Sequence, residues 1–95
     1  MEIYITAVLK AKPEYLEEVI TKLKNVVVKS REEKANIQYN LHQAIEDKHV
    51  LALYEVWKDE VGLANHNEQD YFKELGSLFE TKLQEPPVII NANII

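Results

Sequence analysis

One acidic side chain lies within an otherwise apolar stretch of the sequence. In the segment 49–57 (HVLALYEVW), Glu55 shares its side of a predicted strand with Leu53, so helices packed on that side would point the carboxyl inward. A buried carboxyl group must be paired, hydrogen-bonded or protonated. His66 follows and is a candidate partner. Such a pair would hold the imidazole in one tautomer and leave its other nitrogen free as a base.

Simpler structural roles stay open for these residues. Glu55 could project into a wet sheet edge or an interface, and His66 could simply cap its helix. The aromatic pair Tyr71 and Phe72 opens a second long helix, where such pairs belong to the core more often than to a ligand site. The polar break at 67–70 could nonetheless place Tyr71 at the rim of a pocket.

The other residue types that carry chemistry form no recognisable site. His42 and His49 are expected to face solvent or a turn, and the histidines show no metal-binding spacing. Ser30 and Ser77 lack the setting of a nucleophilic serine. Cysteine is absent and glycine occurs twice, which excludes disulfides, thiolate metal sites and a glycine-rich phosphate loop. The sequence therefore predicts no metal and no common cofactor.

The length and the charge of the chain limit the number of domains and the kinds of partner that it can have. The 95 residues suit a single domain, 1–95, of an ordinary globular composition. The net charge is −5, with 11 basic residues interleaved among 16 acidic ones, which argues against a nucleic-acid partner. No run approaches the ~18 apolar residues that span a bilayer, and no leader peptide is visible. We therefore expect no membrane partner and a cytoplasmic location.

The elements that must position these side chains follow from periodicity. Runs rich in β-branched residues and the alternation along 36–44 predict strands, and helical spacing of apolar residues predicts helices. Asp59 is a good helix N-cap, and Pro86-Pro87 ends the last helix. The predicted order is strand 2–10, helix 13–30, strand 36–44, strand 49–57, a short helix from Glu60 to about His66, a helix 71–83, and strand 88–95. This β-α-β-β-α-β order is the ferredoxin-like α+β arrangement, a four-stranded antiparallel sheet with its helices on one face.

The second face of that sheet is also apolar in sequence. The third strand carries Ala52, Tyr54 and Val56 on the side away from Leu53, and the first and last strands are similar. Apolar patches above a few hundred Å² are uncommon on monomers. We therefore expect a second copy of the chain to cover this face, making a homodimer. A monomer with an apolar patch is the alternative.

The centre of the chain resembles a known family. The segment 54–60 (YEVWKDE), followed by Leu63-Ala64 and then His66, resembles the central motif of the antibiotic biosynthesis monooxygenase family. The segment 85–87 (EPP) before the last strand and the leading strand with its charged helix are also similar to that family. The resemblance covers nearly the whole chain.

The resemblance implies a fold and a chemistry. Family members form dimeric α+β barrels with a pocket between sheet and helices in each subunit. Several oxidise quinols or phenols with O₂ and without metal or flavin, because the deprotonated substrate itself reduces O₂. By this resemblance His66 and Glu55 would be the base and its orienter, Trp57 would wall the pocket, and Tyr71 would donate to the oxyanion. The implied substrate-binding residues are Trp57, Tyr71, Phe72, Thr6 and Leu53.

Two branches of the family match poorly. The haem-degrading branch has an Asn at the position of Thr6, a Trp at that of His66 and a haem-ligating His at that of Gly76, so the resemblance argues against haem. From its own sequence context, Thr6 is expected to be a packed β-branched residue. The polyketide anthrone-type oxygenases share Trp57 but differ at Leu53, Leu63 and Ser77.

A third branch acts on a phosphorylated autoinducer sugar by moving protons. It shares Tyr54-Glu55, Asp59-Glu60 and His66, and its phosphate would need cations such as Lys58 or Lys73. The leading hypothesis is a cofactor-independent monooxygenase that oxidises a quinol-like or phenolic molecule with O₂. The alternatives are a non-oxidative isomerase or degradation enzyme for a small sugar-like ketone, and a dimer that only binds small molecules.

Overall fold

The computed structural model describes all of residues 1–95, and its elements follow the predicted order. The chain forms β1 (Ile3–Lys10), the 3₁₀ turn η1 (Pro13–Tyr15), α1 (Leu16–Arg31), β2 (Asn36–Gln43), β3 (Val50–Trp57), α2 (Glu60–Asn67), α3 (Asp70–Thr81) and β4 (Val88–Ala92). The predicted β-α-β-β-α-β order is confirmed, with α2 and α3 separated at the polar break. Pro13 begins η1 rather than α1, and β4 ends at Ala92.

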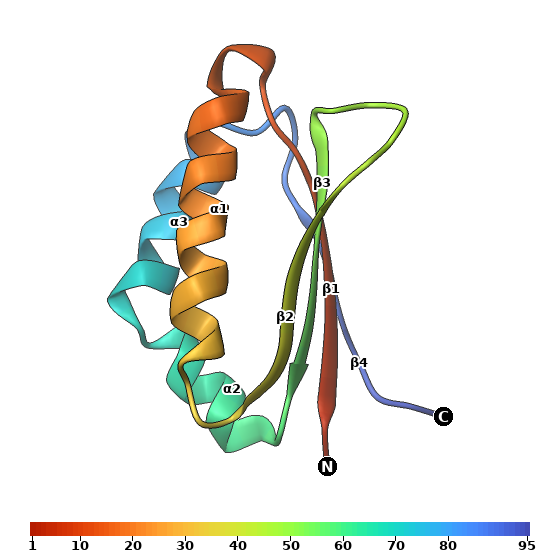
Figure 1. Ribbon diagram of the computed structural model, residues 1–95, viewed down its shortest axis with the longest axis vertical. Coiled ribbons are helices and arrows are strands. Elements are labelled where there is room, and N and C mark those ends of the chain that lie inside the picture. The colour runs from red at the N-terminus through yellow and green to blue at the C-terminus, as the bar shows by residue number, and fades with distance from the viewer.

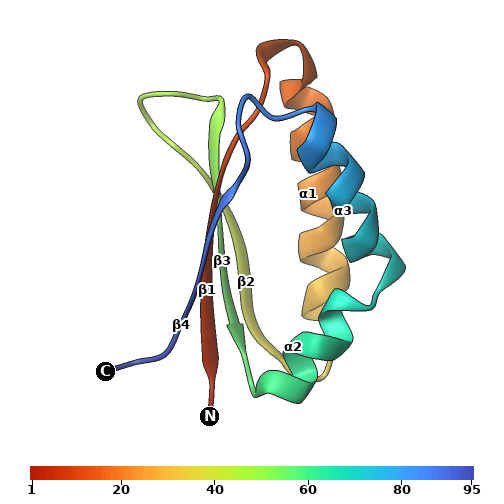
Figure 2. The ribbon, with the colours of Figure 1, turned by 180° about the vertical axis from the view of Figure 1, so that it is seen from behind.

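The four strands form one antiparallel sheet in the order β2-β3-β1-β4. Figures 1 and 2 show the helices together on one side of the sheet, with α1 and α3 running along it and α2 near one end. The predicted ferredoxin-like α+β fold, with helices on one face, is confirmed.

The strand register decides which side chains face the helices. Ile5 and Tyr39 both pair with Glu55, so these three residues lie in one row across β1, β3 and β2 on the helix side. The inward direction predicted for Glu55 is confirmed, since only 5% of this residue is exposed. A register shift between Asn36 and Gln38 inserts an extra residue into β2 and sets Tyr39 opposite Glu55.

The core fills the space between the sheet and the helices. Trp57 and Tyr39 are its largest fully buried side chains, and their rings meet edge to face with centroids 6.3 Å apart. Helix α1 buries one stripe of apolar residues spaced by three or four positions, as the sequence predicted. That stripe comprises Leu16, Val19, Leu23, Val26 and Val27.

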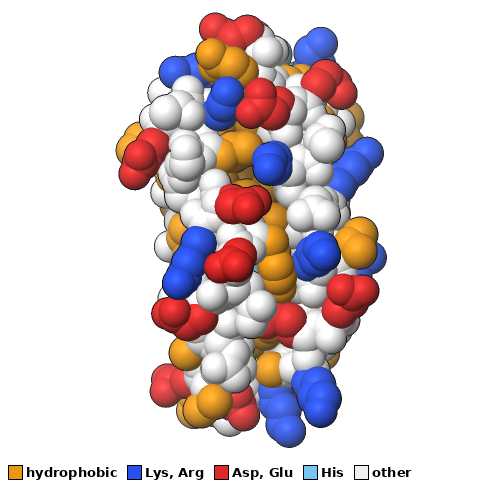
Figure 3. Space-filling model, turned by 90° about the vertical axis from the view of Figure 1, so that its left-hand side faces the viewer, with side chains coloured by type: hydrophobic (Ala, Val, Ile, Leu, Met, Phe, Trp, Pro, Cys, Tyr) orange, Lys and Arg blue, Asp and Glu red, His pale blue; other side chains and the backbone are white.

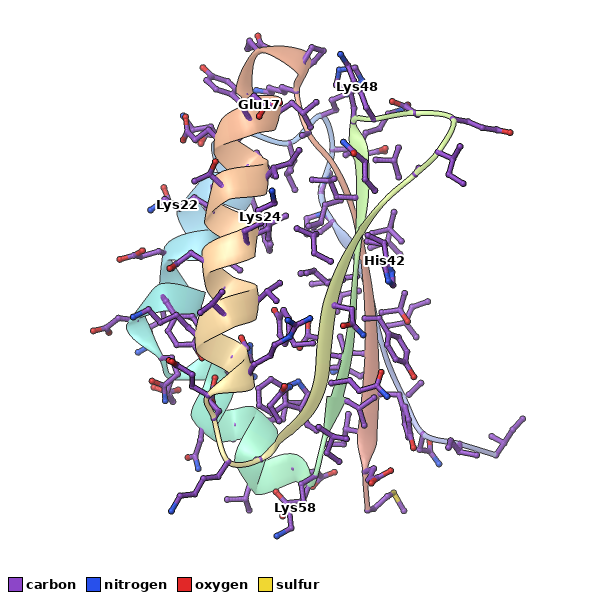
Figure 4. All side chains as sticks on the ribbon, in the orientation of Figure 1. Glu17, Lys22, Lys24, His42, Lys48 and Lys58 are labelled. Atoms are coloured by element: carbon purple, nitrogen blue, oxygen red, sulfur yellow. The ribbon has the colours of Figure 1, made fainter.

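The helix-free face of the sheet is partly apolar and partly polar. Exposed valine and isoleucine side chains lie on β1 and β4, represented by Val8, Val88 and Ile90. His42 lies on the polar β2 portion, and Figure 4 shows it on the side away from the helices. The outer surface of the helices is instead covered by acidic and basic side chains that are mixed together (Figure 3). No helix is long and apolar enough to cross a membrane.

Candidate functional site

Helix α2 carries His66, the histidine predicted to act as a base. The Asp59 carboxylate caps its first turn by accepting a hydrogen bond of 2.8 Å from the backbone N–H of Gly62. Gly62 and His66 are one turn apart on the same side of the helix, and both are buried. Only 1% of His66 is exposed.

The partner of His66 is Glu33, not Glu55. His66 Nδ1 lies 2.7 Å from Glu33 Oε2, and the Tyr71 hydroxyl donates to the same carboxylate oxygen. Glu33 comes from the turn between α1 and β2, so this cluster joins that turn to α2 and α3. Glu55 instead accepts a 2.9 Å hydrogen bond from the indole N–H of Trp57, two residues along its own strand. The prediction that Glu55 pairs with His66 is therefore wrong.

The hydrogen bonds determine the state of the imidazole. A carboxylate only accepts hydrogen bonds, so Nδ1 carries the proton toward Glu33 and Nε2 of the neutral ring keeps its lone pair. Burial lowers the pKa of His66 below its usual value, and the hydrogen bond and charge of Glu33 act in the opposite direction. The net lowering of the pKa favours the neutral ring. Nε2 is buried and has no hydrogen-bond partner.

Aromatic rings surround this imidazole. The Trp57 ring lies against it with centroids 4.4 Å apart, and the Phe72 ring is 4.8 Å away. Tyr39 and Tyr71 complete the shell, at 5.8 Å and 6.0 Å. Apolar neighbours of this kind disfavour the charged form of the ring and fix its orientation.

The carboxyl group of Glu55 lies in a different environment from that of Glu33. Burial raises the pKa of Glu55, and the Trp57 hydrogen bond only partly opposes this effect. No Lys, Arg or His nitrogen forms an ion pair with it. A buried carboxyl group without a cation favours its protonated form.

A cavity of about 330 Å³ lies between the sheet and the helices α2 and α3. This volume falls at the lower end of the range of small-molecule sites. Most of its wall is apolar, and none of the residues that line it is Lys or Arg. The lining residues of β1, β2 and β3 are Ile5, Ala7, Tyr39, Leu53 and Glu55, those of α2 and α3 are Leu63, His66, Asn67, Phe72, Leu75 and Phe79, and those of β4 are Ile89 and Asn91.

The structure brings together only some of the residues implied by the family resemblance. His66, Glu55, Leu53 and Phe72 all line the cavity. Trp57 is fully buried behind His66 and does not border the cavity, which corrects its predicted position in the wall.

Two further expectations need correction. Thr6 pairs with Tyr54 on the helix-free face and is exposed there, because successive residues of a strand point to opposite faces. It lies away from the cavity and is not a packed core residue either. The Tyr71 hydroxyl is engaged by Glu33 and does not line the cavity. Burial and this hydrogen bond raise the pKa of Tyr71.

Two residues of the site were missed by the sequence analysis. Glu33 lies in a mixed-charge cluster that is typical of a solvated turn, and its partner is 33 positions away. Tyr39 belongs to the segment 36–44, which was predicted as a strand without any role for this residue in the site. The period-two alternation of 36–44 placed Tyr39 on the same side as Leu41, which was the one available sign that it faces inward. No group of three or more His, Asp or Glu side chains is arranged to hold a metal ion.

Comparison with known proteins agrees with the fold and the central motif. Residues 2–76 match the family model described as antibiotic biosynthesis monooxygenase. The chain is 35% identical over 71 residues to a Bacillus subtilis protein named "Putative monooxygenase YcnE", with 75% of each protein covered.

Solved structures give the same result over nearly the whole chain. PA3566 from Pseudomonas aeruginosa is 28% identical, with a TM-score of 0.91 over 99% of this chain and 94% of that one. A conserved protein from Methanosarcina mazei is 29% identical, with a TM-score of 0.90 over 98% and 92% of the two chains. The chain belongs to the antibiotic biosynthesis monooxygenase family.

Proposed function

We propose that this protein is a cofactor-independent monooxygenase that oxidises a quinol-like or phenolic small molecule with O₂. Family membership and the similarity to a protein named as a monooxygenase support a monooxygenase-like function. The observation that carries the finer proposal is a buried histidine with an unpartnered Nε2 in the wall of an apolar cavity.

In this proposal His66 is the general base. Nε2 takes the proton of a phenolic hydroxyl, and the imidazolium that forms is stabilised by Glu33 through Nδ1. The resulting phenolate is the electron donor to O₂. Two-electron oxidation of a quinol alone would give a quinone and H₂O₂, without transfer of an oxygen atom, and would be oxidase rather than monooxygenase activity. Where a ring carbon is oxygenated, one oxygen atom of O₂ enters the product and the other leaves as water.

Substrate must displace a neighbouring side chain to reach this base. Nε2 is covered from solvent in the ligand-free protein. Phe72 is suited to move, because it lines the cavity, lies 4.8 Å from the imidazole and is only half-buried. We expect its ring to rotate toward solvent when substrate enters.

Oxygen uptake tests the proposal directly. With a panel of benzo- and naphthohydroquinones, the wild-type protein should consume O₂ faster than the spontaneous reaction and form, in step, a ring-oxygenated product that carries one atom of ¹⁸O₂. Formation of quinone and H₂O₂ alone would show an oxidase and contradict the proposal. A His66→Asn variant serves as the control for spontaneous oxidation. Ketone isomerisation or proton exchange without O₂ uptake would instead support the proton-shuttle alternative, and saturable binding without turnover the binding alternative.

The cavity disfavours a phosphorylated sugar as substrate. A phosphate group needs cations or clustered N–H donors, and no Lys or Arg lines the cavity. Lys58, one of the two candidates for that role, is exposed and points away from the body of the protein beyond β3 in Figure 4. Lys73 is exposed on α3 and pairs with Glu68.

We also propose that the protein is a homodimer formed through the helix-free face. Val8, Val88 and Ile90 are 41%, 59% and 55% exposed there, and this apolar part of the face, on β1 and β4, would be buried in a face-to-face pair of sheets. Sedimentation equilibrium at micromolar concentration should give twice the chain mass. Val8→Lys should shift the population toward monomer, whereas Val28→Lys on the outer side of α1 should not. A wild-type monomer would contradict the proposal.

A further inference from the structure

Two buried polar side chains with unpartnered end atoms line the same cavity. His66 Nε2 and the Tyr39 hydroxyl are both buried without a hydrogen-bond partner, and each residue is only 1% exposed. Buried polar atoms are nearly always hydrogen-bonded in folded proteins. Ser30 Oγ is a third atom of this kind, but Ser30 does not line the cavity. Tyr39 and His66 belong to the cavity wall although these two atoms are covered, so the atoms are candidates for bonds that a ligand supplies once a neighbouring side chain moves.

The two atoms have complementary chemistry. Nε2 of the neutral imidazole accepts a hydrogen bond, and the Tyr39 hydroxyl donates one. Burial and the neighbouring Glu55 raise the pKa of Tyr39, so the hydroxyl keeps its proton. Ser30 and Glu55 lie beside the hydroxyl, and hydrogen bonding to them contributes to the pKa of Tyr39. Neither side chain meets the hydroxyl at the distance and angles of an ordinary hydrogen bond, so a ligand oxygen would compete with these weak contacts.

The two rings are near enough for one small molecule to reach both. Their centroids are 5.8 Å apart, and they come from β2 and α2 on opposite sides of the layer between sheet and helices. The cavity beside them has mostly apolar walls, which suits a flat ring system. With no lysine or arginine in these walls, an anionic group would enter without a counter-charge.

We propose that Tyr39 is the second polar contact of the substrate, so that the cavity selects an uncharged aromatic molecule with two oxygens, one O–H for His66 and one acceptor for Tyr39. This inference rests on the proposed role of His66. It gives Tyr39 the donor role that the family resemblance implied for Tyr71, whose hydroxyl is committed to Glu33. Hydroquinones and hydroxyaryl ketones belong to the selected class, and simple phenols lack the second contact.

Anaerobic calorimetry with two naphthalene probes tests this selection. 1,4-Dihydroxynaphthalene offers both oxygens, and 1-naphthol offers one. Wild-type protein should bind the diol about two- to tenfold more tightly, which is the usual worth of one hydrogen bond. Tyr39→Phe should remove this preference. Tyr15→Phe should retain it, because Tyr15 lies outside the cavity.

The results that would contradict the role of Tyr39 differ from those that would contradict the oxygenase proposal. An unchanged preference in Tyr39→Phe, or no binding of either probe to wild type, would overturn the role of Tyr39. Binding is measured without O₂, so a retained diol preference together with absent O₂ uptake would overturn the oxygenase proposal alone.

The stability of the ligand-free variant separates a binding role from a structural one. If the Tyr39 hydroxyl is an unpartnered donor, Tyr39→Phe removes a buried unsatisfied group and should raise the unfolding midpoint by about 4–8 °C. A lower midpoint would show that the hydroxyl has a partner within the protein, and would overturn the inference.

Discussion

Replacing His66 by asparagine should lower kcat for oxygen uptake by about 10²–10⁴-fold, the usual contribution of a general base. Asparagine keeps an N–H donor near the position of Nδ1 for Glu33, and it removes the Nε2 lone pair. The variant should therefore fold while losing the base. A kcat within twofold of wild type would remove His66 from the mechanism.

The pH dependence gives an independent check on the same group. Activity requires the neutral imidazole, and burial lowers the pKa of His66 from its usual value of 6.5. Activity should consequently persist through pH 6.5 and fall only at lower pH, as Nε2 becomes protonated. An acid limb centred above pH 6.5 in the kcat/KM profile would contradict this assignment.

Glu33 is a positioning residue whose effect is visible in that profile. Its hydrogen bond and charge raise the pKa of His66 against the larger effect of burial. Glu33→Gln should therefore move the acid limb to lower pH, and it should lower kcat about tenfold or more because the imidazolium loses its carboxylate. The matched control is Glu32→Gln, in the adjacent exposed residue, which should leave both quantities unchanged. An unmoved acid limb in Glu33→Gln would show that Glu33 does not act on His66.

The fold was predictable because its signals are local. The β-branched, apolar segments 2–10 and 49–57 and the alternating segment 36–44 indicate strands, and the spacing from Leu16 to Val27 indicates the long helix. The direction of Glu55 followed from the period of two along a strand, because all odd-numbered residues of β3 share one face. The same period of two shows why the prediction of Thr6 as a substrate-binding residue was wrong. Ile5 and Ala7 face the helices, so Thr6 between them faces away from the cavity.

The partners within the site were not predictable in this way. Glu33 reaches His66 only because the turn after α1 meets α2, a contact between residues 33 positions apart. Nothing in the cluster 31–34 distinguishes Glu33 from Glu32 before the chain folds. Tyr39 lies opposite Glu55 because of the extra residue between Asn36 and Gln38. No glycine or proline marks this irregularity in the sequence. The sequence pattern indicates which face of a strand or helix a residue lies on, but its side-chain partners depend on contacts between elements that are distant in the sequence.

The two glycines of the chain should respond in opposite directions to the same substitution. A Cβ added at Gly62 would lie 2.2 Å from Ala35 Cβ, far inside van der Waals contact, whereas a Cβ at Gly76 would meet nothing within 4 Å. Gly76→Ala, in an exposed position of α3, should stabilise the protein by about 0.5–1 kcal/mol through helix propensity. Gly62→Ala should destabilise it by about 1–3 kcal/mol through overpacking.

The crowding at Gly62 also bears on catalysis. Ala35 lies two residues after Glu33, and Gly62 lies one turn before His66, so the close approach of these two small residues brings base and carboxylate together. A methyl group at Gly62 pushes α2 away from the turn and lengthens the His66–Glu33 hydrogen bond. We therefore expect Gly62→Ala to lower kcat as well as the free energy of unfolding, while Gly76→Ala leaves kcat unchanged.

A second substitution shows whether this contact is the cause. In the Gly62→Ala, Ala35→Gly double variant, the 2.2 Å contact is gone, and the nearest remaining neighbours of the new methyl group are Asp59 Oδ1 at 3.2 Å and Ala35 Cα at 3.6 Å. Ala35→Gly alone should be mildly destabilising, because it removes a half-buried methyl group and adds backbone freedom. The double variant should nevertheless be more stable and more active than Gly62→Ala, with a coupling energy of at least about 1 kcal/mol from urea unfolding. Additive effects would mean that Gly62 acts through its backbone, and that the spacing of His66 and Glu33 is set elsewhere.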